Sequence, residues 1–192
     1  TVRNIEQLQP FWEEGDALAD AFFLDSAIQY DGAAATSFVG ADHLEGETVA
    51  CFADGVQVED VTISNGGFTL AAAASKVLIG YAYTCQYLSM PIEAGAADGT
   101  SQGKPGSIAR IALRLHQTGS GLSYGVTLDD LRTVPLSDTP RSDVAPASGL
   151  LDGDSDELTM PMNQIRRRTI ALQHTGALPC TVVGVFPRLE AR

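Results

Sequence analysis

The sequence predicts an all-β protein, an antiparallel sandwich or barrel-like domain with a short helical lead-in at its N-terminal end. Short runs of β-branched and aromatic residues recur along the 192 residues, and such residues are enriched in strands. Glycine-containing turn pairs separate several of these runs, as they do in hairpins. Apolar and polar residues alternate within the runs, which indicates strands with one buried face.

Residues 1–21 are predicted to form a helical or irregular lead-in. Apolar residues recur there near helical spacing, but Pro10 and Gly15 interrupt the pattern. The chain begins with Thr1 rather than Met, so we expect an upstream region to precede it.

Residues 22–30 are the first expected strand, and Asp31-Gly32 is expected to end it in a turn. A meander follows in residues 42–70. Its first hairpin joins residues 48–52 to the alternating run that begins at residue 56. The pair Asp54-Gly55 lies between them and favours a type I′ turn, because both central positions of that turn need a positive φ. Asn65-Gly66 predicts a second such turn before residues 68–70.

The rest of the chain predicts further strands separated by long loops. We predict that residues 22–192 form one β-rich domain, with two sub-modules at 22–92 and 107–192 as an alternative. The last two strands are expected to pair as a hairpin. The expected strands are 76–90, 107–115, 129–136, 169–173 and 181–186, a turn is expected at 117–125, and loops are expected at 93–106 and 137–156.

Negative charge is concentrated in the first third of the chain. Residues 1–60 contain thirteen acids and one base, and the remaining residues contain eleven of each, so the first third carries the whole net charge of −12. Contacts to phosphate need Lys and Arg, which excludes a surface that grips DNA there. The acids could form a surface past which DNA slides without binding, or they could face a basic partner. They could also serve only to keep the protein soluble.

Cysteine use and hydropathy exclude several classes of protein. Cys51, Cys85 and Cys180 are widely spaced and form no CxxC pair, and the three histidines lack metal-ligand spacing, so we predict no disulfide scaffold, metal site or cofactor. Reduced cysteines fit synthesis in a reducing cytoplasm. No stretch approaches the ~20 apolar residues that span a bilayer, and no signal peptide is visible.

Two short motifs suggest chemistry, and each has a simpler interpretation. Residues 121–125 match G-x-S-x-G, but the strand before Ser123 and the helix after it that a nucleophile elbow needs are missing. We interpret this stretch as a glycine-rich turn and predict no enzyme, with a serine hydrolase as a rival hypothesis. Asp152, Asp154 and Asp156 hint at Ca²⁺, but the Gly and Glu of an EF-hand loop are absent. We interpret this stretch as a solvated acidic loop, with weak Ca²⁺ binding as a rival hypothesis.

Arg166, Arg167 and Arg168 form a compact basic cluster. It could bind phosphate or an acidic partner, including the acidic first third of a neighbouring copy in a head-to-tail ring. A solvated surface run is the simpler interpretation, and we favour it on general grounds.

Several segments, taken in order, resemble one family. Phe22–Gly32 reads FFLDSAIQYDG and Gly40–Gly55 reads GADHLEGETVACFADG. They resemble the FxxDSGLTYDG and GLDHLEGxTVxVLADG segments of the tail nozzle proteins (tail tubular protein B) of short-tailed bacteriophages. The chain departs from the family at Ala41, where Leu is usual. Further similar segments are 64–70, 74–83, 102–115 and 179–190.

The resemblance implies a virion structural protein rather than an enzyme. Nozzle subunits form a six-fold ring below the adaptor ring of the tail and close or line the channel through which the genome leaves. We therefore expect a homo-oligomer, a hexameric ring in the intact protein, that contacts the adaptor and other tail proteins. DNA would pass it transiently and non-specifically, without any membrane contact. Synthesis is expected in the bacterial host cytoplasm, and the final location is the virion tail.

Candidate residues for the channel or the subunit interface follow from charge. Some of the acids are expected to face the channel or a neighbouring subunit. The candidates are Glu45, Glu47, Asp54, Glu59, Asp60, Arg166, Arg167 and Arg168.

A second hypothesis is a β-sandwich module at a tail tip that binds a glycan or a receptor. Trp12, Tyr81, Tyr83 and Tyr87 could supply stacking platforms for such a ligand, although core packing also explains aromatic residues in strands.

Overall fold

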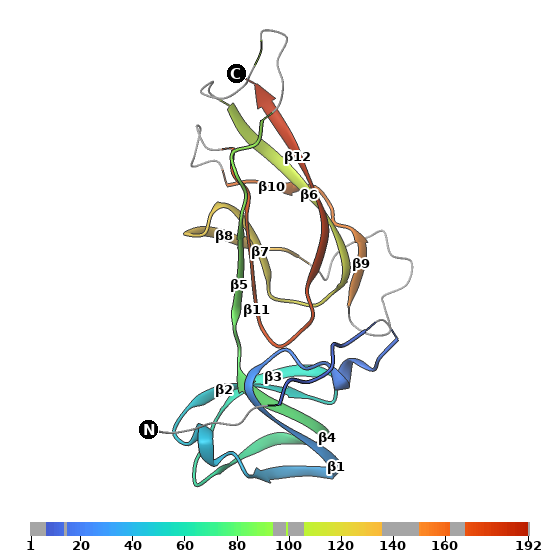
Figure 1. The fold of residues 1–192 in the computed structure, drawn as a ribbon, viewed down its shortest axis with the longest axis vertical. Coiled ribbons are helices and arrows are strands. Elements are labelled where there is room, and N and C mark those ends of the chain that lie inside the picture. The colour runs from blue at the N-terminus through green and yellow to red at the C-terminus, as the bar shows by residue number, and fades with distance from the viewer. Residues whose placement is uncertain are drawn as a thin grey trace. The chain divides into compact units, whose positions relative to one another are not determined.

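The computed structural model describes residues 7–13, 15–93, 99, 106–135, 150–161 and 168–191. Antiparallel strands dominate this part of the chain, as the sequence predicted (Figure 1). The chain divides into two compact units: unit 1 is Thr1–Tyr83 with Gly176–Pro179, and unit 2 is Thr84–Thr175 with Cys180–Arg192.

Unit 1 is built on one four-stranded sheet with the strand order β1-β4-β2-β3. Its neighbours pair antiparallel throughout. Both end strands, β1 and β3, leave an edge unpaired within the described strands, so the sheet does not close into a barrel. The strands are β1 (Asp25–Val39), β2 (Thr48–Ala53), β3 (Val56–Thr62) and β4 (Gly67–Tyr81).

Both predicted hairpin turns of unit 1 are confirmed. Asp54 and Gly55 have φ of 48° and 86°, and Asn65 and Gly66 have φ of 54° and 69°. These are the positive values that a type I′ turn requires at both central residues. Asn and Asp tolerate this backbone region better than other non-glycine residues, so the turns follow directly from local sequence.

The predicted turn at Asp31-Gly32 is wrong. β1 runs through these residues to Val39, and its register against β4 shifts between Asp31 and Ala35. The Tyr30 hydroxyl donates a hydrogen bond to the carbonyl oxygen of Ala33 at 2.7 Å within this irregular stretch. A bulge takes up the residues that suggested a turn, because β4 is long enough to pair with the whole strand.

Unit 1 buries side chains on both faces of its sheet. β2 illustrates this, because Val49 and Cys51 belong to one core cluster whereas Ala50 and Phe52 belong to another. A strand that is buried on both faces reads as a continuous apolar run instead of an alternating one, which explains the sequence TVACF. The second cluster also contains Ala177.

The helical form of the lead-in is not found in residues 7–13 and 15–21. Their only helical element is one 3-10 turn, η1 (Leu18–Asp20). Pro10 cannot donate a helical hydrogen bond, and Gly15 has a φ of 102°, outside the helical region. A second 3-10 turn, η2 (Asp42–Leu44), lies between β1 and β2. Within the described residues, we find no helical segment with the length and hydropathy of a membrane span.

Unit 2 contains two antiparallel four-stranded sheets. One has the order β5-β11-β7-β8, and in the other β6 pairs with β10, β12 and β9. The strands are β5 (Thr84–Leu88), β6 (Gly106–Thr118), β7 (Leu122–Thr127), β8 (Asp130–Thr133), β9 (Leu151–Asp154), β10 (Leu158–Thr159), β11 (Ala171–Thr175) and β12 (Thr181–Ala191).

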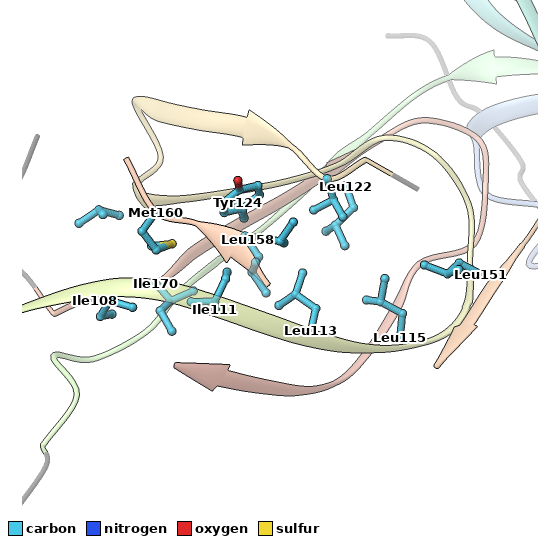
Figure 2. Packing of buried hydrophobic residues seen from close by; sticks show 13 residues of the cluster. Ile108, Ile111, Leu113, Leu115, Leu122, Tyr124, Leu151, Leu158, Met160 and Ile170 are labelled. Atoms are coloured by element: carbon cyan, nitrogen blue, oxygen red, sulfur yellow. The ribbon is translucent and has the colours of Figure 1, made fainter. Parts of the chain in front are cut away.

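One hydrophobic core joins the two sheets of unit 2 in a sandwich-like arrangement. Figure 2 shows its side chains lying between the strands, with Leu113 and Leu115 from β6 and Leu122 and Tyr124 from β7. The Tyr124 hydroxyl is satisfied because it donates to the carbonyl oxygen of Thr159 at 3.2 Å. The alternation of apolar residues and arginines along β6 places the apolar side chains in this core and Arg110 toward solvent.

The predicted hairpin of the last two strands is wrong. β11 pairs with β5 and β7, whereas β12 pairs with β6 in the other sheet. The residues between them, Gly176–Pro179, belong to unit 1. Turn residues between two strands indicate a change of direction, but they do not say whether the strands pair.

Three further boundaries differ from the prediction. The apolar run 76–90 is not one strand, because β4 ends at Tyr81 and β5 begins at Thr84 in the other unit. The predicted turn at 117–125 is shorter, because β7 already begins at Leu122. Part of the predicted loop 137–156 forms β9, which is paired with β6 through Arg114 and Leu115. Each difference depends on a pairing partner that is distant in sequence.

Candidate functional site

Glu45 holds two loops of unit 1 together. It follows η2, and its two carboxylate oxygens accept hydrogen bonds from the backbone N–H groups of Asn65 (3.0 Å) and Gly66 (2.7 Å). The carboxylate therefore ties the end of η2 to the β3–β4 turn. Although the side chain is exposed, its hydrogen-bonding capacity serves the fold of its own chain.

Asp54 has an equivalent role at the β2–β3 turn. Its carboxylate accepts hydrogen bonds from the backbone N–H groups of Lys76 (2.8 Å) and Ser75 (3.1 Å), and its own N–H donates to the Lys76 carbonyl oxygen at 2.8 Å. Asp54 thus connects this turn to β4.

Glu47, Glu59 and Asp60 are the candidate acids that lie open on the surface of unit 1. All three are exposed, and none forms an ion pair with another residue that the structure describes. Glu59 and Asp60 are consecutive in the edge strand β3, so their side chains point to opposite faces of the sheet. The charge on Asp60, after the larger effect of burial, helps to raise the pKa of the Cys51 thiol to about 11.

Unit 1 has almost no positive charge to balance its acids. Its residues include thirteen acids but only two bases, Arg3 and Lys76, and Arg3 lies outside the described residues. Lys76 is paired, because its ammonium group hydrogen-bonds to Asp20 and lies 3.8 Å from a carboxylate oxygen of Asp31. The hydrogen bond to Asp20 is the main cause of the raised pKa of Lys76.

The arginine cluster lies only partly within the described chain. Arg166 and Arg167 fall outside the described residues. Arg168 is half-buried, its carbonyl oxygen accepts a hydrogen bond from the Ile92 N–H at 2.8 Å, and its guanidinium group packs closely over Gly106. The guanidinium group of Arg168 therefore lies against the start of β6 in unit 2.

Asp152 and Asp154 both use their carboxylates within unit 2. Asp152 lies 2.8 Å from His116 Nδ1 and accepts a hydrogen bond from the Gln117 N–H at 2.8 Å. Asp154 accepts two hydrogen bonds from Arg114, at 2.6 and 2.9 Å, which lower its pKa. Across the described residues, no group of three or more His, Cys, Asp or Glu side chains is placed to hold a metal ion.

Ser123 is the second residue of β7, and it pairs with Thr133 of β8 and with Gln173 of β11. A serine at that position is not on a strand-to-helix turn, so the nucleophile elbow is not formed. His174, on β11, is buried, and its Nε2 lies 3.2 Å from the carbonyl oxygen of Ser120. Burial lowers the pKa of His174 more than this carbonyl raises it.

Unit 1 contains a large hollow that the sequence did not reveal. Its volume is about 1190 Å³, and it lies between the N-terminal segment, the start of β1, η2 and the end of β4. It brings together three of the four aromatic residues proposed as stacking platforms, Trp12, Tyr81 and Tyr83. Sequence spacing gave no signal, because Trp12 and Tyr83 are far apart along the chain.

Unit 2 contains a smaller cavity of about 570 Å³ between its two sheets. Cys85 and Cys180 line it, together with His174. The pKa of the Cys180 thiol is raised to about 11, mainly by burial and also by the charge of Cys85. The two cysteines come near each other only through the fold of unit 2.

We compared the chain with protein-family models and with curated proteins. No protein-family model matches the chain, and no curated protein matches it.

Proposed function

We propose that this protein is a structural component of the tail of a short-tailed bacteriophage, part of the nozzle ring through which the genome leaves. The proposal starts from the ordered resemblance of residues 22–32, 40–55 and later segments to tail nozzle proteins. It is supported by what the residues of these segments do in unit 1.

The main support for the proposal is that two acidic residues of the segment 40–55, which resembles the nozzle proteins, stabilise the fold of unit 1. Glu45 and Asp54 both belong to the segment 40–55, and each carboxylate accepts hydrogen bonds from backbone N–H groups of a distant loop or strand. Charge-assisted hydrogen bonds of this kind are among the stronger ones in proteins. A segment whose polar groups fix its own backbone suits a scaffold better than a site of chemistry.

The long paired strands also suit a mechanical role. β1 and β4 have 15 residues each and pair along most of their length. In unit 2, β6 has 13 residues and β12 has 11, and they pair from Thr181 to Ala191. Each such ladder fixes many backbone groups at once, which favours a stiff wall.

The charge of unit 1 supports a role beside passing DNA. Glu47, Glu59 and Asp60 are exposed, and the only described base of unit 1 is already paired with Asp20 and Asp31. Such a surface offers phosphate no cation to bind. At physiological ionic strength, salt screens the repulsion between these carboxylates and DNA phosphates beyond roughly 8 Å. An acidic channel wall would therefore keep DNA from adhering to it without repelling DNA that lies further away.

These observations narrow the candidate residues for the channel or the subunit interface. Glu47, Glu59 and Asp60 come first, because Glu45 and Asp54 are engaged within their own unit. A channel lined by Arg166, Arg167 and Arg168 would contradict this assignment.

Immunogold electron microscopy tests the proposal most simply. Antibodies raised against the purified chain should label the distal tail of virions of the phage that encodes it. Antibodies against the capsid are the control. Labelling of capsids alone, or absence of the chain from purified virions by mass spectrometry, would refute the assignment.

A further inference from the structure

We propose that the hollow of unit 1 is a binding site for a neutral oligosaccharide. The inference does not depend on the role in a phage tail, because it rests only on the residues that line this hollow. Failure of one proposal would leave the other standing.

The hollow has the size of a ligand site. At about 1190 Å³ it is slightly larger than small-molecule pockets, which range over roughly 300–1,000 Å³. It is bounded by residues 7–12 on one side and by the start of β1, η2 and the end of β4 on the others. A few linked sugar rings match this volume better than a single ring does.

Aromatic side chains supply surfaces on which sugar rings stack. Tyr81 and Tyr83 line the hollow and are 38% and 46% exposed. Trp12 is half-buried and held in place, because its indole N–H donates to the Ala17 carbonyl oxygen at 3.1 Å and its ring packs edge-on against Phe23. The C–H faces of a pyranose pack on such rings while its hydroxyls stay free for hydrogen bonds.

The polar groups of the hollow match hydroxyls. Gln7, Gln9 and Gln29 line it, and each amide offers both donors and an acceptor. His43 Nε2 lies 2.9 Å from the carbonyl oxygen of Ser26. A carbonyl only accepts, so Nε2 carries the proton and Nδ1 of the neutral ring is an acceptor.

The backbone of the hollow is distorted in a way that ordinary sheet pairing does not need. Ser26 has a φ of 49° and lies within the register shift between Asp25 and Ile28 of β1. A non-glycine residue in this region costs conformational energy, and both such strain and β-bulges are found frequently at binding sites. All of Asp25, Ser26 and Ala27 line the hollow.

Charge selects among possible ligands. No lysine or arginine is among the described residues that line the hollow, and Asp25 contributes a carboxylate. Phosphates, nucleotides and acidic sugars are therefore disfavoured in a unit with thirteen acids and two bases. A cation would need acceptors only, whereas the three amides bring as many donor groups as acceptors. A neutral saccharide satisfies both kinds of group.

The test begins with a glycan array and the full chain. The array should carry neutral oligosaccharides of glucose, galactose and N-acetylglucosamine, together with sialylated and phosphorylated counterparts. We expect saturable binding to one or more neutral glycans. Trp12 is the only tryptophan of the chain and lines the hollow, so titration with the best neutral binder should change its fluorescence with the same midpoint.

Matched tyrosine variants locate the site. Tyr81→Ala and Tyr83→Ala should each weaken binding about five- to tenfold through lost stacking. Tyr87→Ala is the control, because Tyr87 is 54% exposed on β5 of unit 2 and does not line the hollow. Circular dichroism of each variant separates lost contacts from unfolding, and the Trp12 titration of the unaltered chain does not depend on any variant.

Several results would overturn the proposal. One is the absence of saturable binding to every neutral glycan on the array. Another is preferential binding of the acidic glycans, or of choline as a cation probe. A third is a bound glycan that leaves Trp12 fluorescence unchanged, or whose affinity falls as much in Tyr87→Ala as in Tyr81→Ala.

Discussion

At the scale of single residues, unit 1 uses carboxylates as ligands for its own backbone. In the sequence, Glu45 and Asp54 look like any other surface acids. They were grouped with Glu47, Glu59 and Asp60 because all five side chains are negatively charged. Their hydrogen bonds join segments about twenty residues apart. Because of that separation, the charge pattern of the sequence could not distinguish the acids that bind backbone N–H groups from the acids that face solvent.

The pair Glu45 and Glu47 provides a direct test of this distinction. Glu45→Ala should destabilise unit 1 by about 1–3 kcal/mol, because two backbone N–H groups lose a charged acceptor. Glu47→Ala should change the free energy of unfolding by less than about 0.5 kcal/mol. Urea unfolding followed by Trp12 fluorescence reports on unit 1 alone, and equal effects of the two substitutions would contradict the assigned role.

His174 makes the stability of unit 2 depend on pH. Burial lowers its pKa below the ordinary 6.5, so the unfolded chain binds the proton more tightly. Stability is then full above about pH 6.5 and falls as the pH drops from there toward the folded pKa. Unfolding of unit 2 measured between pH 5 and pH 8 should show this decline, and His174→Gln should reduce it. An unchanged pH dependence in the variant would show that other groups cause it.

The three cysteines should differ in reactivity. Cys85 is exposed, Cys51 is fully buried, and burial raises the pKa values of Cys51 and Cys180 to about 11. Because the thiolate is the reactive form, iodoacetamide at pH 8 should label Cys85 first, Cys180 slowly and Cys51 only after unfolding. Peptide mass spectrometry gives the order, and early labelling of Cys51 would contradict the packing of β2.

At the scale of elements, the sequence predicted two hairpin turns of unit 1 correctly, but it failed at the bulge of β1 and at the pairing of the last two strands. The turns at Asp54-Gly55 and Asn65-Gly66 depend on two adjacent residues, and both are confirmed. The hairpin predicted for the last two strands failed because β11 and β12 pair with strands more than forty residues away, in different sheets. The hollow was likewise invisible to the sequence, since its aromatic residues come from distant segments.

Two glycines in the loops that Glu45 joins allow the cost of backbone strain to be measured apart from the cost of a steric clash. Gly46 has a φ of 80° and open space where a Cβ would lie, whereas at Gly66, with a φ of 69°, a Cβ would collide with the Asp42 carboxylate. Gly46→Ala should cost about 1–2 kcal/mol through strain alone, and Gly66→Ala should cost more. Urea unfolding checks the order, and equal costs would mean that the Asp42 side chain moves freely aside.

At the scale of the whole molecule, the two units differ in charge. Unit 1 has thirteen acids and two bases, and unit 2 has eleven acids and ten bases. Within unit 2, ion pairs such as Arg114–Asp154 and Arg110–Glu157 balance the charge locally. The net charge could be predicted from the sequence, but the ion pairs that neutralise unit 2 could not, because their partners lie about forty residues or more apart in sequence.

Reversing the exposed charge of unit 1 should impair genome passage. Glu59→Lys combined with Asp60→Lys gives the edge strand β3 two cations that can bind phosphate. We expect phage carrying both substitutions to assemble but to eject DNA more slowly, with the defect reduced at high salt. Glu59→Gln with Asp60→Asn is the matched control that removes charge without adding it. Unchanged ejection in the Lys variant would place β3 away from the channel.

The proposed assembly into a ring is tested most directly by native mass spectrometry of the intact protein. We expect a dominant species of six copies, in which this chain accounts for six times 20.2 kDa. A protein that stays monomeric at every concentration, with and without the adaptor protein, would contradict it.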